Sequence, residues 1–294
     1  MKICLITPPS QNVEPYIEIF ERKGVQVQKN SASSDCDFIV GTGQAYIGLW
    51  EYYHKYFPDI PMVNLTLDLY KTVWTAPNPH NYDWQKYKDF LNKSVELWCL
   101  SDEVVLRMEE EGIDPKTCKV MKIWARFFDY GGEIVDNRYI LKTIRPYKYD
   151  KNYGWLERAC SELDIPLKQP NHQASEEEYQ KLLAECSFMC CDYHETSTGG
   201  LGLMEGYNLG KLSVISDSPY QGAKDYLGDN AIYFDDNNYE DFKRVIKETW
   251  ENTPTTDLKE CQAFCKAHPS IEDNVDFMID RMNALLKKNG EQND

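Results

Sequence analysis

Residues 193–216 read YHETSTGGLGLMEGYNLGKLSVIS, and this stretch decides how the rest of the chain is interpreted. Its pattern predicts the end of an apolar strand, a glycine-rich turn, a short helix and a second strand. Gly199, Gly200 and Gly202 leave backbone N–H groups uncovered where the chain turns into the helix. These groups and the positive end of the helix dipole together attract anions. The stretch therefore predicts a phosphate site.

Two glutamates, Glu195 and Glu205, bracket the glycine turn. A carboxylate repels a phosphate, so carboxylates beside a phosphate site are expected to accept hydrogen bonds from hydroxyl groups, such as those of a ribose or another sugar. Recognition of phosphate and of sugar hydroxyls at one turn indicates a nucleotide-sugar ligand.

Length, composition and charge bound the class of protein. The chain has 294 residues, which suffices for two domains with separate cores, and a hydrophobic fraction of 42%, which is ordinary for a folded protein. Its net charge of −16 argues against a surface that holds nucleic acid or an anionic membrane.

The cysteines and the N-terminal sequence indicate the compartment. The ten cysteines form no CxxC pair and no zinc spacing, and several lie in apolar runs, which predicts reduced, buried thiols. The apolar part of MKICLITPPS is too short for a signal peptide, and no apolar run approaches membrane-spanning length. We therefore expect a cytoplasmic protein without a membrane span.

Strands and helices are expected to alternate along the first half of the chain. Helices are expected to end at Gly24 and Gly112, and Ser101 is expected to cap the second of these. The predicted strands are residues 3–6, 25–27, 38–40, 61–67, 96–100 and 120–124. A loop rich in aromatic residues, 70–82, is long enough to suggest a function.

The alternation restarts after a Gly-Gly pair in the segment 125–137. A helix stripe is expected at Tyr153, Leu156, Ala159, Cys160 and Leu163, and Ser175 with Glu178 predicts a capping box. Further strands are expected at 139–144, 188–191, 212–215 and 231–234, and a last helix at 271–287. The alternation predicts an α/β protein with parallel sheets covered on both faces.

Three segments then resemble one known family. These are LWCLSDEVVLRMEEEGIDPKTCKVMKIWARFFD (97–129), YILKTIRPYKYDKNYGWLERAC (139–160) and FMCCDYHETSTGGLGLMEGYNLGKLSVISDSPYQGAKDYLGDNAIYF (188–234). They resemble the end of the first domain, the opening of the second domain and the glycine-bearing motif of GT-B glycosyltransferases of the retaining family-4 type. Arg145 and Lys151 stand at the places of the family's basic pair.

The resemblance implies two Rossmann-like, doubly wound domains facing a cleft. The N-terminal domain, 1–130, would lie on the acceptor side, and the C-terminal domain, 131–270, would bind the nucleotide-sugar. The segment 271–294 would supply a helix that packs back across the domains and a frayed tail.

The resemblance also implies roles for individual residues. Arg145 and Lys151 would meet the charge on the departing diphosphate, so that no metal or other cofactor is required. Glu205 would hold the nucleotide ribose, and either Glu195 or Thr198 would touch the donor sugar, because the two glutamates lie farther apart than the family's pair. The expected donor-binding residues are Thr198, Gly199, Gly200, Leu201, Gly202 and Glu205.

The expected reaction transfers a sugar from a UDP- or GDP-sugar to a hydroxyl acceptor with retention of configuration. Asp68, Trp74 and His80 follow a predicted strand of the first domain and are the acceptor-side candidates. The adjacent pair Asp235 and Asp236 is interpreted as a solvated turn rather than as a metal motif.

Two alternatives remain at the level of sequence. The acceptor is expected to be a saccharide, but viral enzymes of this general fold act on a modified DNA base, which would require a basic track in the cleft. A non-catalytic nucleotide-sugar binder or scaffold is the alternative from another class, because the first loop reads Thr7-Pro8-Pro9-Ser10 and the glutamate spacing is stretched. The oligomeric state is left open.

Overall fold

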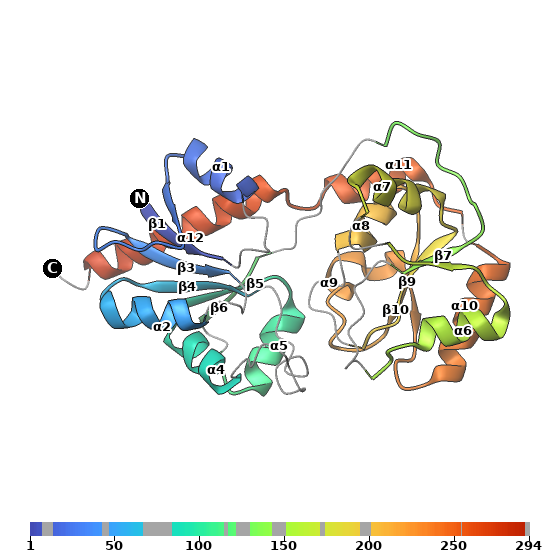
Figure 1. Ribbon diagram of the computed structural model, residues 1–294, viewed down its shortest axis with the longest axis horizontal. Coiled ribbons are helices and arrows are strands. Elements are labelled where there is room, and N and C mark those ends of the chain that lie inside the picture. Colours follow the sequence, from blue (N-terminus) through green and yellow to red (C-terminus); the bar gives the residue numbers. More distant parts are fainter. Residues whose placement is uncertain are drawn as a thin grey trace. The chain divides into compact units, whose positions relative to one another are not determined.

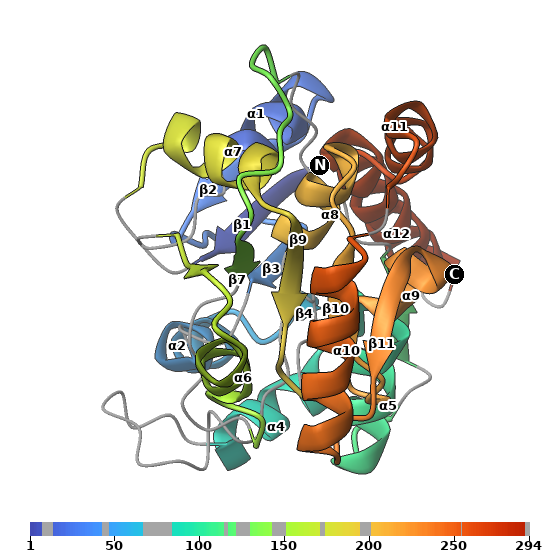
Figure 2. The ribbon, with the colours of Figure 1, turned by 90° about the vertical axis from the view of Figure 1, so that its right-hand side faces the viewer.

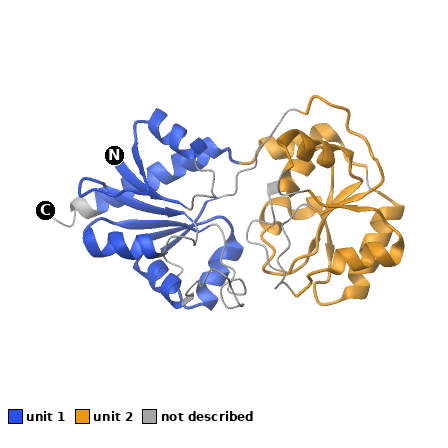
Figure 3. Ribbon diagram, in the orientation of Figure 1, with its two compact units in different colours: residues 1–124, 269–294 blue, residues 125–268 orange. Residues whose placement is uncertain are grey.

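The computed structural model describes residues 1–7, 14–42, 47–66, 84–114, 117–121, 130–142, 151–170, 174–194, 201–253 and 255–291. The chain divides into two compact units, which Figure 3 colours separately. Unit 1 consists of residues 1–124 and 269–294, and unit 2 of residues 125–268. Each unit contains one sheet with helices on both faces (Figure 1).

Unit 1 has the strand order β2-β1-β3-β4-β5-β6, and every described pairing in it is parallel. Its strands are β1 (Lys2–Ile6), β2 (Gln26–Lys29), β3 (Phe38–Thr42), β4 (Met62–Thr66), β5 (Glu96–Cys99) and β6 (Cys118–Val120). Its helices are α1 (Glu14–Arg22), α2 (Ile47–Tyr56), α4 (Trp84–Lys93), α5 (Asp102–Glu110) and α12 (Ile271–Glu291).

Alternate residues of each buried strand supply two separate cores in unit 1. Ile3 and Leu5 of β1 pack with α1 and α12 on one face of the sheet. Cys4 and Ile6 pack with α2, α4 and α5 on the other face. Because successive strand residues point to opposite faces, such strands are apolar throughout, as the sequence predicted.

Unit 2 has the order β11-β10-β9-β7-β8, again with only parallel pairings among the described residues. Its strands are β7 (Ile140–Lys142), β8 (Leu167–Lys168), β9 (Phe188–Cys191), β10 (Ser213–Ser216) and β11 (Ala231–Phe234). Its helices are α6 (Trp155–Leu163), α7 (Glu176–Glu185), α8 (Leu201–Asn208), α9 (Lys224–Leu227), α10 (Tyr239–Glu251) and α11 (Leu258–Lys266).

The helices of unit 2 also form two layers. In Figure 2, α6 and α10 lie side by side over the strands, and their apolar residues share a core with Ile140, Phe188 and Val214. Helix α8 contacts α7 and α11, and a Cβ on Gly206 of α8 would meet the Met189 side chain of β9 at 2.2 Å. Gly206 therefore lets α8 lie directly on the sheet.

Several local predictions are confirmed. Gly24 and Gly112 have φ values of +82° and +74°, which only glycine adopts readily. The Ser101 side chain accepts from the Val104 N–H, and Ser175 with Glu178 forms the predicted capping box. All ten cysteines are free and buried.

Three local predictions are wrong or incomplete. Tyr153 is exposed in the turn before α6, because Gly154 has a φ of +85° and interrupts the expected helix. The strand expected at 120–124 begins instead at Cys118, which pairs with Leu97. Helix α11 was not predicted, although Asp257 caps it and Cys261 and Cys265 form its buried stripe.

The last helix, α12, belongs to unit 1, where it lies beside α1 (Figure 1). Val275, Met278 and Met282 are buried against the sheet. Arg281 donates through Nε to Oε2 of the buried Glu96 carboxylate at 2.9 Å, and this oxygen also accepts from Trp98 Nε1 at 2.9 Å.

Within the described residues, no helix combines the length and apolar character needed to cross a membrane.

We expect Arg281→Met to lower the free energy of unfolding by about 2 kcal/mol, because it leaves the buried Glu96 carboxylate without its cation. Arg22→Met is the matched control, since Arg22 also bonds α12, through Glu272, but both partners are about half exposed or more. That change should cost less than about 0.5 kcal/mol. Urea unfolding measures both, and equal losses would contradict the importance of the buried pair.

Candidate donor site

The strand order of unit 2 identifies the edge of its sheet where a ligand would bind. From β7 the chain moves to β8 on one side and then returns to β9 on the other side. In open parallel sheets, ligands bind at the carboxyl ends of the strands where this reversal occurs. Lys142 is the last residue of β7, and Asp192 directly follows β9.

Lys142 and Asp192 form a buried ion pair at this point, with side chains 1% and 0% exposed and a closest N–O distance of 3.0 Å. The Lys142 ammonium also contacts the half-exposed Glu157 of α6 at 3.1 Å. Burial alone would lower the pKa of Lys142, but the charge of Asp192, aided by Glu157, outweighs it and raises the pKa. The ammonium therefore stays protonated at neutral pH.

The same carboxylate fixes the start of α6. Asp192 Oδ2 accepts from the Leu156 backbone N–H at 3.0 Å, in the first turn of that helix. An anion is favoured there, because the first N–H groups of a helix have no partner within the helix. Asp192 thus joins β7, β9 and α6.

A second polar cluster lies on the same edge of the sheet. Lys151, in the turn before α6, pairs with Asp236 Oδ2 at 2.8 Å. Asp236 follows β11, and His194 Nδ1 bonds the same carboxylate oxygen from the segment after β9. Residues from three loops that are distant in sequence therefore meet at one oxygen atom.

The prediction that Asp235 and Asp236 form a solvated turn is wrong for Asp236. Asp236 is only 6% exposed, whereas Asp235 is exposed. Burial alone would raise the pKa of Asp236, but the hydrogen bonds from Lys151 and His194 hold that pKa below its ordinary value. Asp236 is therefore an ionised, partnered carboxylate at neutral pH.

Helix α8 carries the other described residues of the predicted site. Helix α8 begins at Leu201, so the short helix predicted here is confirmed, but Gly202, which was expected in the turn, is already its second residue. Glu205 is buried within α8, at 8% exposure. The next residue, Gly206, faces the Met189 side chain of β9, so Glu205 is adjacent in sequence to a point where the helix backbone approaches the strand.

The remaining predicted site residues lie outside the described part of the chain. On the donor side these are Arg145, Glu195, Thr198, Gly199 and Gly200. On the acceptor side they are Asp68, Trp74 and His80. Their roles stay predictions.

Sequence reasoning missed the polar residues Lys142, Asp192, His194 and Asp236. Each of them ends a strand or lies within three residues of a strand end. The rule that parallel sheets bind ligands at their carboxyl edge could have selected these positions. Their pairing could not have been predicted, because it depends on the order of the strands.

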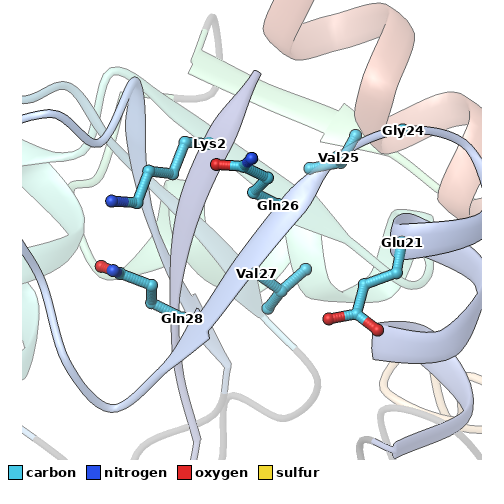
Figure 4. A pocket seen from close by; sticks show the side chains of 7 residues that line it. All are labelled: Lys2, Glu21, Gly24, Val25, Gln26, Val27 and Gln28. Carbon is cyan, nitrogen blue, oxygen red and sulfur yellow. The ribbon is translucent and has the colours of Figure 1, made fainter.

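A pocket of about 600 Å³ lies elsewhere, along the edge strand β2 of unit 1 (Figure 4). Gln26 and Gln28 point to one side of β2 and Val27 to the other. Lys2, which also lines the pocket, is paired with Asp35 at 2.7 Å. All residues that line this pocket belong to unit 1, and none of them is a residue of the candidate donor site.

Comparison with known proteins supports the fold. The sequence matches no protein-family model and no curated protein. Among solved structures, Anabaena HepE in complex with UDP and glucose has a TM-score of 0.70 at 12% identity, over 97% of this chain and 100% of that chain. Sucrose-phosphate synthase from Thermosynechococcus elongatus has a TM-score of 0.73 at 10% identity, over 98% and 100%.

A third structure, the apo form of the lipopolysaccharide outer core galactosyltransferase WaaB, has a TM-score of 0.65 at 10% identity, over 98% and 100%. At these identities the likeness establishes the fold. The chain has the two parallel-sheet α/β domains of GT-B glycosyltransferases. The fold class predicted from the sequence is confirmed.

We expect Asp192→Asn to lower the free energy of unfolding by about 3 kcal/mol, because it removes the charge that neutralises the buried Lys142 ammonium. Glu157→Gln is the matched control. It removes the other carboxylate on the same ammonium, but that carboxylate is 47% exposed, so the loss should stay below about 1 kcal/mol. Thermal unfolding of the two variants compares them directly. A smaller loss for Asp192→Asn than for Glu157→Gln would contradict this ranking.

Proposed function

We propose that this chain is a retaining glycosyltransferase of the family-4 type, which moves a sugar from a nucleotide-sugar donor to a hydroxyl of a saccharide. The observation that carries the proposal is the cluster of Lys151, Asp236 and His194, which brings a cation to the end of β9. In the sequence, the glycines predicted to hold a diphosphate, Gly199 and Gly200, lie between His194 and the start of α8.

The chemistry of the donor explains why a cation is needed there. Cleavage of the bond between the anomeric carbon and the phosphate oxygen leaves negative charge on the diphosphate. Lys151 supplies a compensating charge, together with Arg145 and the amides of the glycine turn. The leaving phosphate accepts the proton of the acceptor hydroxyl on the same face of the sugar, so that the configuration is retained without a protein nucleophile.

The nucleotide is held by the same domain. Glu205 accepts hydrogen bonds from the ribose hydroxyls, and Glu195 or Thr198 contacts the donor sugar. A UDP-sugar is our first choice of donor, because a solved structure with this fold, HepE, is complexed with UDP and glucose. Asp68, Trp74 and His80 are our candidates for contact with the acceptor.

A screen of UDP, GDP and ADP and their sugars by thermal unfolding tests the donor class. A nucleotide present at 100 times its Kd should stabilise the protein by about 2.7 kcal/mol. Donor hydrolysis or transfer should then be measurable with the nucleotide that binds. Nucleotide binding without turnover on any acceptor would favour the non-catalytic binder.

We expect Lys151→Ala to reduce kcat/KM for donor turnover about 100-fold, because the departing diphosphate loses a positive partner. Lys181→Ala is the control, since Lys181 is a well-exposed lysine of unit 2 on α7. It should leave turnover unchanged. Activity assays with circular dichroism of both variants separate loss of chemistry from loss of fold. Unchanged turnover in Lys151→Ala would rule out the role proposed for this lysine.

We expect Glu205→Gln to weaken UDP binding about 10-fold, because hydrogen bonds to a charged acceptor contribute about 1.5–3 kcal/mol. The loss should be specific to the ribose. Wild-type protein should bind UDP more tightly than its 2′,3′-dideoxy analogue, and this preference should be smaller in the variant, because the glutamine oxygen is an uncharged acceptor. Titration calorimetry gives both affinities. An intact preference for UDP in a folded variant would show that Glu205 does not contact the ribose.

A further inference from the structure

From the contacts around Lys151 we infer that Asp236 is a positioning residue for the transfer reaction, which aims the Lys151 ammonium at the diphosphate of the donor. The inference rests on the proposed function of the same site. It adds a residue that the sequence pattern had assigned to solvent, and it gives His194 and Asn237 a part in the same arrangement.

The first step concerns the geometry of the ammonium group. Lys151 Nζ donates to Asp236 Oδ2 at 2.8 Å and to Asn237 Oδ1 at 2.8 Å. A lysine ammonium has three N–H donors arranged as a tetrahedron. Once two of them are fixed by acceptors, the direction of the third is fixed as well. Among the described residues Lys151 Nζ bonds these two acceptors, and we assign its third N–H to a phosphate oxygen of the donor.

The second step concerns what holds the acceptors in place. Asn237 Nδ2 donates to Asp236 Oδ1 at 2.9 Å, which closes a ring of hydrogen bonds among the three side chains. His194 bonds Asp236 Oδ2 from the end of β9. The Asp236 side chain is 9% exposed, whereas that of Lys151 is 41% exposed. The buried carboxylate is therefore the fixed member, and the flexible lysine is the member that it orients.

The third step concerns charge. An unpaired carboxylate beside a diphosphate would weaken binding by repulsion. Here the negative charge of Asp236 is matched by Lys151 and further compensated by the hydrogen bond from His194. The third N–H of Lys151 points away from the Asp236 carboxylate. A phosphate that approaches along this N–H therefore meets the ammonium before the carboxylate. Asp236 thus orients the lysine at little electrostatic cost to the ligand.

The fourth step predicts where the effect appears in the kinetics. A diphosphate carries more negative charge after the bond to the sugar breaks than before. A well-placed ammonium therefore interacts more strongly with UDP and with the transition state than with the intact UDP-sugar. Loss of positioning should lower kcat and UDP affinity more than it raises KM for the donor.

The test compares Asp236→Asn with Asp235→Asn, a matched pair that removes one negative charge at neighbouring positions. Asp235 is exposed and accepts from backbone N–H of Asn237, and no described contact joins it to Lys151. With UDP and UDP-glucose as probes, Asp236→Asn should raise the Kd of UDP about 10-fold and lower kcat about 10-fold, while KM changes less than about threefold. Asp235→Asn should change each value less than about twofold.

A double-mutant cycle shows whether Asp236 acts through the lysine. In a Lys151→Met background, Asp236→Asn should have less than about a twofold further effect on the Kd of UDP, because there is no ammonium left to orient. If Asp236→Asn raises the Kd of UDP just as much in the Lys151→Met background, the inference is overturned. Tighter UDP binding by Asp236→Asn alone would also overturn it, because it would mean that the carboxylate competes with the ligand.

Folding defects and failure of the proposed function are recognised separately. Asn237 is exposed, and Asn237→Ala opens the same ring of hydrogen bonds, so it should raise the Kd of UDP about threefold even where Asp236→Asn does not fold. An unchanged Kd in that variant counts against the inference. If the wild-type protein binds UDP and the variants bind it equally, the inference alone fails. If the wild-type protein binds no nucleotide, the proposed function fails and the inference fails with it.

Discussion

The buried carboxylate of Asp192 is the constraint on which the ligand edge of unit 2 depends. It neutralises Lys142 at the end of β7, and it accepts from the first turn of α6. A lysine ammonium that is 1% exposed cannot remain charged in an apolar core unless a carboxylate accompanies it. The same contact sets where α6 begins, and the turn that carries Lys151 directly precedes this helix. This buried ion pair therefore fixes the start of the helix that follows the Lys151 turn.

The two lysines at this edge differ in what they can do. Lys142 is enclosed, and exchanging Asp192 for a ligand would cost several kcal/mol for an uncompensated buried charge. Lys151 is 41% exposed, so its ion pair with Asp236 contributes little net free energy and its ammonium can take an additional partner at small cost. The inner pair thus shapes the site, and the outer pair supplies the charge that meets the substrate.

The elements could be predicted from the sequence because their causes are local. Apolar runs gave the buried strands, and Gly24, Gly112 and the Ser175–Glu178 box gave helix ends. The polar site could be predicted only where a single loop contains it, as with the glycines that precede α8 at Gly199 and Gly200. The bond between His194 and Asp236 joins residues 42 positions apart. This bond forms because β9 and β11 lie on either side of β10, which brings the segments after both strands to the same edge of the sheet. The sequence pattern does not contain this order of strands.

The two sheets are wound in the same order, β2-β1-β3-β4-β5 in unit 1 and β8-β7-β9-β10-β11 in unit 2, so chemistry rather than topology distinguishes their ligand edges. In unit 1 the strand order reverses between β1 and β3, and the buried threonines Thr7 and Thr42 lie at the carboxyl ends of these strands. Thr42 Oγ1 donates to the Ile6 carbonyl of β1. In unit 2 the corresponding strand ends carry Lys142 and Asp192, with Lys151 and Asp236 beside them. Burying a charge is costly, and charged groups in unusual environments concentrate at functional sites. Among the described strand ends, this difference supports the proposal that unit 2 binds the diphosphate.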